Sequence, residues 1–357
     1  MGVGRVRFGL QFFPDVVASQ KSPAEYYDEA MRLISYCDVY GYSHVRTVEH
    51  YFHYWGGYSP SPLMFLTAAC QHTKTATMVT GAVLPAFNHP LQLSSHIAML
   101  DGLSNGRLEV GFARAFLPQE FRHFGVDIDQ SVDRFEEGIE QVQKLLEEEN
   151  VTCDGRFHSF SDVTTYPRPT QSPRPPFYVA AVGTPASFER AGKMGHGIMA
   201  IPGVGSDPMA LMKIYRDAWA EAGHPGKPKL MMAVMMYCHE DRDEAMRIAK
   251  PRVEGHFSSI ADAMSEYGGG SPSDAYKNYD KMREKIAAQT LEMQIESMAA
   301  FVGTPDDIEE QLRAFDDATG GCDEVSMQVL YDNMAYEDAE RSVKLFGEEV
   351  IPRFQEV

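Results

Sequence analysis

Short apolar runs alternate with longer amphipathic stretches along most of the chain. The apolar runs are continuous rather than interrupted by polar residues at every second position, which is typical of parallel strands buried on both faces. The amphipathic stretches are long enough to be helices with one buried face. The pattern therefore predicts about eight strand-then-helix units. The predicted strands are 6–12, 43–48, 75–84, 108–112, 176–181, 197–201, 230–238 and 325–329.

Capping residues mark where the helices begin and end. Ser22 precedes Pro23 and lies three residues before Glu25, a combination that favours the first turn of a helix. This helix should end before Gly41, because glycine readily adopts the left-handed conformation that terminates helices. The other predicted helices begin at Pro62 and Thr304 or span 90–103, 132–148, 185–194, 208–222, 241–251 and 335–354.

Two folds are compatible with this series of units, a closed barrel and an open, doubly wound sheet. Eight units in one chain favour a single (β/α)8 barrel, or TIM barrel, that spans residues 1–357 as one domain. The proline-rich segment 167–176 is either a domain linker or, in the preferred interpretation, a surface loop that leads into the fifth strand.

A long insertion separates the seventh and eighth predicted strands. Its part 255–290 contains a run of three glycines at 268–270 and is otherwise largely polar. Long insertions at a barrel mouth often act as lids, so we predict a mobile lid here. The alternative is a poorly ordered excursion without function.

Composition and charge exclude several classes of partner. Hydrophobic residues make up 44% and charged residues 23% of the chain, as in ordinary globular proteins. The formal net charge of −19 repels nucleic acids and anionic membranes, so neither is expected as a partner. There is no run of 18 apolar residues and no apolar signal core at the N-terminus. The five cysteines form no C-x-x-C pair, which favours the reducing cytoplasm.

Candidate catalytic residues follow the predicted strands, because barrel enzymes carry their active sites at the C-terminal strand ends. His50 follows the second strand and is a candidate general base, although a structural histidine is the alternative. Its neighbour Glu49 points the opposite way on a strand and is predicted to be a buried, paired carboxylate. His50 and His53 have no third ligand at a suitable spacing, so no metal is expected.

A candidate anion site follows the fifth strand. Gly183, Thr184 and Pro185 form a capped helix start whose free backbone amides and dipole favour an anion. Ser187 adds a hydroxyl group, and Arg114, after the fourth strand, could supply the charge that binds a phosphate. The alternative is an ordinary capped helix that binds nothing.

Several short motifs occur in an order typical of one protein family. Segment 47–52 (TVEHYF) is similar to a Glu-His-His-Phe signature, and segment 100–107 (LDGLSNGR) to a Leu-Asp-x-x-Ser-x-Gly-Arg motif. Together the motifs resemble the bacterial luciferase-like flavin-dependent monooxygenases, in particular the luciferase α-subunit branch. The other matching segments are 83–85, 88–90, 111–114, 120–125, 175–181, 190–192, 302–305 and 345–352.

The resemblance implies a dimeric barrel that binds FMN at its mouth, with the flavin reduced by a separate NAD(P)H:flavin reductase. Dioxygen would add to C4a of FMNH2, and the resulting peroxide would oxygenate the substrate. His50 would be the active-site histidine, and Arg114 would bind the FMN phosphate. The other cofactor-binding residues implied are Thr80, Gly81, Ala113, Val182, Gly183, Thr184 and Ser187, with a cis peptide bond expected between Thr80 and Gly81.

Two departures from the family pattern argue against light emission. Ala113 stands where the light-emitting luciferase subunit has a reactive cysteine, and Tyr51 replaces the second histidine of the signature. Aromatic residues near the predicted mouth indicate an apolar substrate, although they are also common in ordinary packing. The predicted substrate pocket consists of Tyr51, Phe52, Trp55 and Phe116, with Phe12, Tyr58 and Met235 nearby.

The sequence therefore predicts an FMNH2-dependent monooxygenase that oxygenates an apolar small molecule. One alternative is a deazaflavin-dependent dehydrogenase on the same scaffold, which would exchange hydride and ignore dioxygen. The other is a flavin-binding protein without catalysis.

Overall fold

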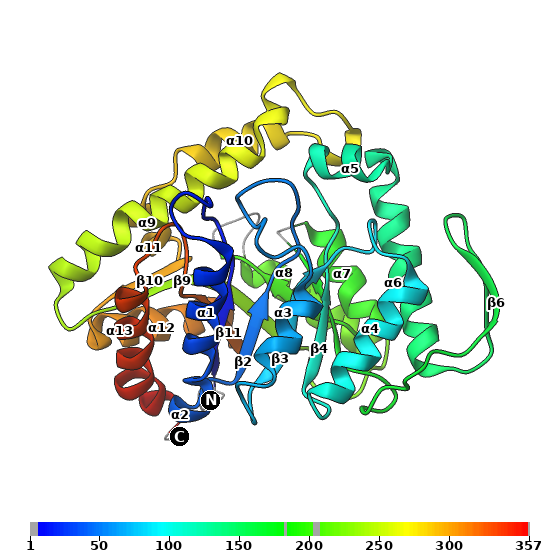
Figure 1. The fold of residues 1–357 in the computed structure, drawn as a ribbon, viewed down its shortest axis with the longest axis horizontal. Coiled ribbons are helices and arrows are strands. Elements are labelled where there is room, and N and C mark those ends of the chain that lie inside the picture. The colour runs from blue at the N-terminus through cyan, green and yellow to red at the C-terminus, as the bar shows by residue number, and fades with distance from the viewer. Residues whose placement is uncertain (1–5, 182–183, 203–207, 356–357) are drawn as a thin grey trace.

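Eight parallel strands close into a barrel in the computed structural model, which describes residues 6–181, 184–202 and 208–355 (Figure 1). Each strand pairs with its neighbour in the ring, and the pairing of β8 with β9 completes the circle. The predicted (β/α)8 fold is confirmed, and each predicted strand overlaps an observed one. The barrel strands are β1 (Arg7–Phe12), β2 (His44–Thr47), β3 (Thr77–Val83), β4 (Leu108–Phe112), β7 (Phe177–Ala180), β8 (Gly197–Ala200), β9 (Leu230–Cys238) and β11 (Glu324–Gln328).

Helices cover the outside of the barrel and begin largely at the predicted caps. In α1 (Pro23–Ile34) the Ser22 side chain accepts from the amide of Glu25, and the Glu25 carboxylate accepts from the amide of Ser22. The chain then forms the short helix α2 (Cys37–Tyr40), which ends at Gly41 in the left-handed conformation. The other covering helices are α3 (Pro62–Ala69), α4 (Pro90–Leu103), α6 (Ser131–Glu147), α7 (Pro185–Met194), α8 (Pro208–Glu221), α12 (Pro305–Thr319) and α13 (Tyr336–Leu345), which continues into η4 (Phe346–Val350) and η5 (Ile351–Phe354).

Several elements were not predicted from the sequence. A hairpin of β5 (Val151–Asp154) and β6 (Ser159–Val163) projects beside α6, and its largely polar strands bury little (Figure 1). Among the described strands, β10 (Ala300–Gly303) pairs with the end of β9 alone and so lies outside the ring. The short helix α5 (Pro118–Phe124) and the turn η1 (Ile128–Gln130) connect β4 to α6.

The prediction that a helix would end at Pro251 was wrong, because α9 (Arg242–Ala263) continues through it. Proline removes the hydrogen bond to the carbonyl four residues earlier, here that of Arg247. Both residues are exposed, so water can satisfy the carbonyl group that is left without its helical partner. Burial of residues later in the helix, including Val253 and His256, stabilises the continuation.

The insertion 255–290 is folded rather than irregular. After the end of α9 it contains η2 (Ser265–Gly269), η3 (Asp274–Tyr276) and α10 (Tyr279–Ala287), and α11 (Leu291–Glu296) follows. It lies beyond one end of the barrel and reaches towards α5 (Figure 1). Contacts with the segment 114–122, which follows β4, hold it there.

The barrel is packed on both sides of its strands. The main core lies between the strands and the helices, while Val79, Tyr178, Met199 and Met231 form a separate apolar cluster. No helix in the described part of the chain combines the length and apolar character needed to cross a membrane.

Candidate functional site

His50 lies just beyond the C-terminal end of β2, at the mouth of the barrel, and is held by a buried carboxylate. Its Nδ1 is 3.1 Å from Oε1 of Glu120, which comes from α5 and also accepts from the amide of Tyr51 at 2.9 Å. Glu120 is completely buried, and its Oε2 has no hydrogen-bond partner. This pairing orients the imidazole, because Nδ1 is engaged while Nε2 has no hydrogen bond within the described residues. An imidazole held in this way can transfer a proton at Nε2.

Aromatic rings surround His50. Trp55 lies 4.3 Å, Phe13 5.5 Å and Phe116 6.1 Å from it, measured between ring centroids. Trp55 and Phe116, which were predicted to line the substrate pocket, are therefore brought to the candidate catalytic residue. Phe13 was missed, although it directly follows the first predicted strand. The rings give the surroundings of His50 an apolar character.

Tyr51 and Phe52, the other two predicted pocket residues, do not pack on His50. The Tyr51 hydroxyl donates to Glu49 at 2.6 Å, and its ring packs edge-on against Phe124. Phe52 is 60% exposed and packs on His123 and Phe124. Tyr51 thus lies on the side of Glu49 rather than on that of His50, and Phe52, which has a φ of 62°, is exposed to solvent.

Glu49 is the predicted buried carboxylate, and its partners are neutral donors. It accepts hydrogen bonds from the Tyr51 hydroxyl at 2.6 Å, the Asn88 side chain at 2.8 Å and the Leu84 amide at 3.0 Å. Burial raises the pKa of Glu49 to about 7, although these hydrogen bonds act in the opposite direction. Through these hydrogen bonds Glu49 connects the residues after β2 to the loop after β3, so its role is structural.

Thr80 and Gly81, which were predicted to bind the flavin, are in β3, and Ala113, the third such residue, directly follows β4. Thr80 is completely buried, and its hydroxyl donates to the carbonyl of Gly111 at 3.0 Å and accepts from its amide at 2.9 Å. The non-prolyl cis peptide joins Gly81 to Ala82, one residue later than expected. At Gly81 a Cβ atom would collide with the Arg46 side chain, so only glycine fits. Ala113 is partly buried and donates its amide to Val83 at 3.0 Å.

The candidate phosphate-binding residues follow two neighbouring strands. The Arg114 guanidinium lies 4.5 Å above the Tyr276 ring and donates to the Ala275 carbonyl at 3.4 Å. Within the described residues Arg114 has no carboxylate partner. The hydroxyls of Thr184 and Ser187 are 2.7 Å apart, and the Thr184 side chain does not cap α7. Val182 and Gly183 lie outside the described residues, and no contact joins Arg114 to the start of α7 within the described parts.

A second histidine–carboxylate pair was missed by the sequence analysis. Nδ1 of His256, in α9, is 2.7 Å from Asp15, whose other oxygen accepts from the Asp332 amide. The Phe13 ring contacts both histidines, with its centroid 5.5 Å from that of each imidazole. The position of Asp15, shortly after the first predicted strand, was an available signal. His256 had none, because nothing local reveals that α9 crosses the mouth.

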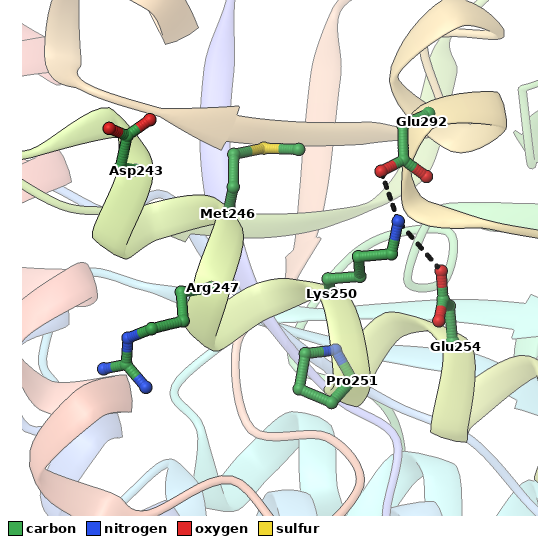
Figure 2. Close-up of a pocket in the computed structure, with 7 residues that line it drawn as sticks. All are labelled: Asp243, Met246, Arg247, Lys250, Pro251, Glu254 and Glu292. Atoms are coloured by element: carbon green, nitrogen blue, oxygen red, sulfur yellow. Dashed lines mark hydrogen bonds and ion pairs between the residues drawn. The ribbon is translucent and has the colours of Figure 1, made fainter.

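A separate hollow on the surface contains none of these residues. It lies along α9 and α11, where Lys250 is 2.5 Å from Glu292 and 3.7 Å from Glu254 (Figure 2). Lys250 is paired with these carboxylates, and Arg247, the other cation that lines the hollow, is paired with Glu244, so the hollow offers no unpaired cation to a ligand within the described residues. Among the residues described, no three His, Cys, Asp or Glu side chains are grouped so that they could hold a metal ion.

Comparison with known proteins identifies the family. A family model described as luciferase-like monooxygenase matches residues 6–321. The crystal structure of monooxygenase RslO1 from Streptomyces bottropensis is similar with a TM-score of 0.87 and 38% identity, covering 98% of this chain and 100% of that chain. The oxygenase component of a flavin-dependent trigonelline monooxygenase from Acinetobacter baylyi is 25% identical over 98% of this chain and 96% of its own length.

A third similarity concerns the fold alone. The oxygenating constituent of 3,6-diketocamphane monooxygenase from Pseudomonas putida, solved in complex with FMN, has a TM-score of 0.77 and 20% identity. It covers 98% of this chain and 99% of its own. The family resemblance predicted from the motifs is confirmed. The chain belongs to the luciferase-like monooxygenase family and is a flavin-dependent oxidoreductase built on a (β/α)8 barrel.

Proposed function

We propose that this protein is an FMNH2-dependent monooxygenase that receives reduced flavin from a separate NAD(P)H:flavin reductase and oxygenates an apolar small molecule. The observation that carries the proposal is His50, oriented by the buried Glu120 and surrounded by Phe13, Trp55 and Phe116 at the mouth of the barrel. The relative from Acinetobacter baylyi is an oxygenase component, which supports a two-component system.

The residues at the mouth fit FMN. Arg114 offers a cation without a carboxylate partner in the described structure, and the first turn of α7 has no side-chain cap, so both suit a phosphate. The bound reduced flavin would supply the electrons that activate dioxygen. The aromatic rings around His50 would exclude water and hold an apolar substrate, while Nε2 of His50 would give or take a proton.

Mixing the protein with FMNH2 and dioxygen tests this function. We expect the absorbance of oxidised flavin to return more slowly than it does for free FMNH2, because the site shields the reacting flavin from water. A deazaflavin-dependent dehydrogenase would instead leave FMNH2 oxidation unchanged and would exchange hydride with its own cofactor. Failure to bind FMN or FMNH2 would contradict the proposal.

We further propose that the insertion 255–290 opens and closes over the flavin. Contacts with the segment 114–122 hold it in the described position: among them, the Tyr267 hydroxyl donates to the Phe116 carbonyl, the Tyr276 hydroxyl to the Ala115 carbonyl, and Gln119 to the Ala263 carbonyl at 2.9 Å. These contacts involve the same segment that carries Arg114, which couples the position of the insertion to the proposed phosphate site.

Limited proteolysis is expected to cut first in 264–279, where short 3-10 turns and the glycine run connect the helices. FMN together with a substrate should protect these sites. The exposed hairpin 151–163 is an internal comparison, since it should be cut equally with and without ligand. First cuts in the hairpin, with no protection of 264–279, would show that the insertion is not a lid.

Finally, we propose a homodimer formed through α3 and α4. These adjacent helices expose Met64, Met99 and Leu103, with exposed fractions of 75%, 54% and 45%. Exposed apolar side chains on neighbouring helices suit a two-fold interface, in which the same surface meets its own copy.

Sedimentation velocity should therefore detect a dimer, and the double substitution of Met64 and Met99 by lysine should convert it to a monomer. Val39→Lys is the matched control, because Val39 is 67% exposed but lies on α2. A wild-type monomer, or a dimer that survives the double substitution, would contradict this interface.

A further inference from the structure

A buried arginine inside the barrel has no acidic partner among the residues that the structure describes. Arg46, in β2, is 7% exposed; it donates to the Gln11 side chain at 2.6 Å and to the Gly81 carbonyl at 3.3 Å. Both acceptors are neutral, and Nε has no hydrogen-bond partner. No carboxylate in the described part of the chain forms an ion pair with Arg46. Burial of a charge without a counter-charge is costly, which suggests that a ligand completes this site.

The strand register places Arg46 at the floor of the mouth. Gln11 in β1 lies opposite both Arg46 in β2 and Gln328 in β11, and Arg46 lies opposite Val79 in β3. Paired residues in a parallel sheet point to the same face, so these side chains form one row inside the barrel, near the C-terminal strand ends. Oε1 of Gln328 is also buried without a hydrogen-bond partner.

The acidic residues near this row are already paired with other groups. Glu120 binds His50, Asp15 binds His256, and Glu49 accepts from three neutral donors. At the opposite end of the strands Glu324 pairs with Arg7, and Glu109 is 3.3 Å from Lys229. The charge of Arg46 is therefore not balanced from within the described structure.

Arg46 nevertheless remains protonated at neutral pH. Burial lowers its pKa, but only to about 10, so it is a cation under ordinary conditions. The side chains that contact His50 are the aromatic rings of Phe13, Trp55 and Phe116 and the carboxyl group of Glu120. None of them is a cation that would hold an anionic substrate, so we infer that the substrate is not the missing anion. The flavin phosphate has its own candidate cation in Arg114. The other part of the cofactor that can be negative is the ring system, which gains a negative charge when the flavin is reduced.

We propose that Arg46 is the counter-charge of the reduced isoalloxazine ring, so that the protein binds reduced FMN more tightly than oxidised FMN. This inference rests on the proposed function. Addition of two electrons and one proton to the neutral oxidised ring gives an anion with its charge spread over N1 and the C2 carbonyl. A nearby guanidinium stabilises this form selectively. Selective binding would favour capture of the flavin after reduction and release of the oxidised flavin after turnover.

The test compares dissociation constants for reduced FMN, measured without oxygen, and for oxidised FMN. In Arg46→Met the preference for reduced FMN should fall by about tenfold or more, equivalent to about 30 mV in the midpoint potential of a two-electron couple. Arg46→Lys keeps the charge and should keep most of the preference. Arg114→Ala is the control, because the phosphate is present in both redox states and the ratio should not change.

Each outcome separates this inference from the function on which it rests. If wild-type protein binds neither form of FMN, the proposed function itself is wrong. If the wild-type protein binds reduced FMN and Arg46→Met keeps the same ratio of dissociation constants for oxidised and reduced FMN, the proposed role of Arg46 is overturned. This holds even if the variant has lost affinity for an anionic substrate, because Arg46 would then bind the substrate and not the flavin ring. Should Arg46→Met fail to fold, the wild-type protein still decides: the midpoint potential of bound FMN must lie above that of free FMN, and a lower value would overturn the inference.

Discussion

Replacement of His50 by alanine is expected to lower product formation by about 10²–10⁴-fold per folded molecule, the usual contribution of a general acid or base. The affinity for reduced FMN should change little, because His50 is not among the proposed phosphate-binding residues. Nδ1 is held by Glu120 at 3.1 Å, so only Nε2 can exchange a proton with the reacting groups. Without it, the activated oxygen should be lost as hydrogen peroxide.

The measurement requires product yield, flavin affinity and melting temperature of the same variant. Some loss of stability is expected, since the His50 ring packs against Phe13 and Trp55. His53→Ala is a matched control, because His53 follows in the same loop but contacts Asp262 at 3.3 Å and the Trp55 amide at 3.1 Å rather than Glu120. It should retain normal turnover. A destabilised His50→Ala enzyme that still converts all its reduced flavin into product would show that His50 is only structural.

Substitution of Arg114 by alanine is expected to weaken FMN binding by about 2–5 kcal/mol, because the phosphate loses its charged partner. The structure raises an alternative, since Arg114 also lies over the Tyr276 ring and donates to the Ala275 carbonyl of the insertion. If Arg114 serves to hold the insertion rather than the phosphate, its substitution would weaken FMN binding indirectly, because the insertion would lose these contacts.

Tyr276→Leu separates the two explanations, because it removes the ring from Arg114 and leaves the guanidinium in place. If Arg114 binds the phosphate, Tyr276→Leu should increase cleavage of the insertion by protease with only a small effect on FMN affinity. Equal losses of affinity in both variants would assign Arg114 to the insertion. Unchanged affinity in Arg114→Ala, measured by flavin titration, would remove the phosphate site.

The barrel fold could be predicted from local features of the sequence. Continuous apolar runs identified each barrel strand, and the serine–proline or threonine–proline steps identified many of the helix starts, including those of α1 and α12. These features act within a few residues, so they are readable without knowledge of the fold. The hairpin 151–163 was not predicted because its strands are largely polar and form no continuous apolar run. The strand β10 was also missed, although residues 298–302 form a short apolar run.

Only some residues of the candidate site could be predicted from local sequence features. His50, Trp55 and Phe116 could be proposed from their positions near the C-terminal ends of predicted strands. Glu120, which orients His50, is 70 residues away in the sequence and belongs to a helix that was not predicted.

The remaining pairings were decided by tertiary structure alone. His256 meets Asp15 across 241 residues, because α9 continues through Pro251 and crosses the mouth. Arg46 meets Gln11 because the register of β1 against β2 aligns them inside the barrel. The sequence by itself thus determined the strands, the helices and the chemistry available at their ends, since these depend on neighbouring residues. Which side chains face each other depends on strand register and the path of long connections, which only the folded chain determines.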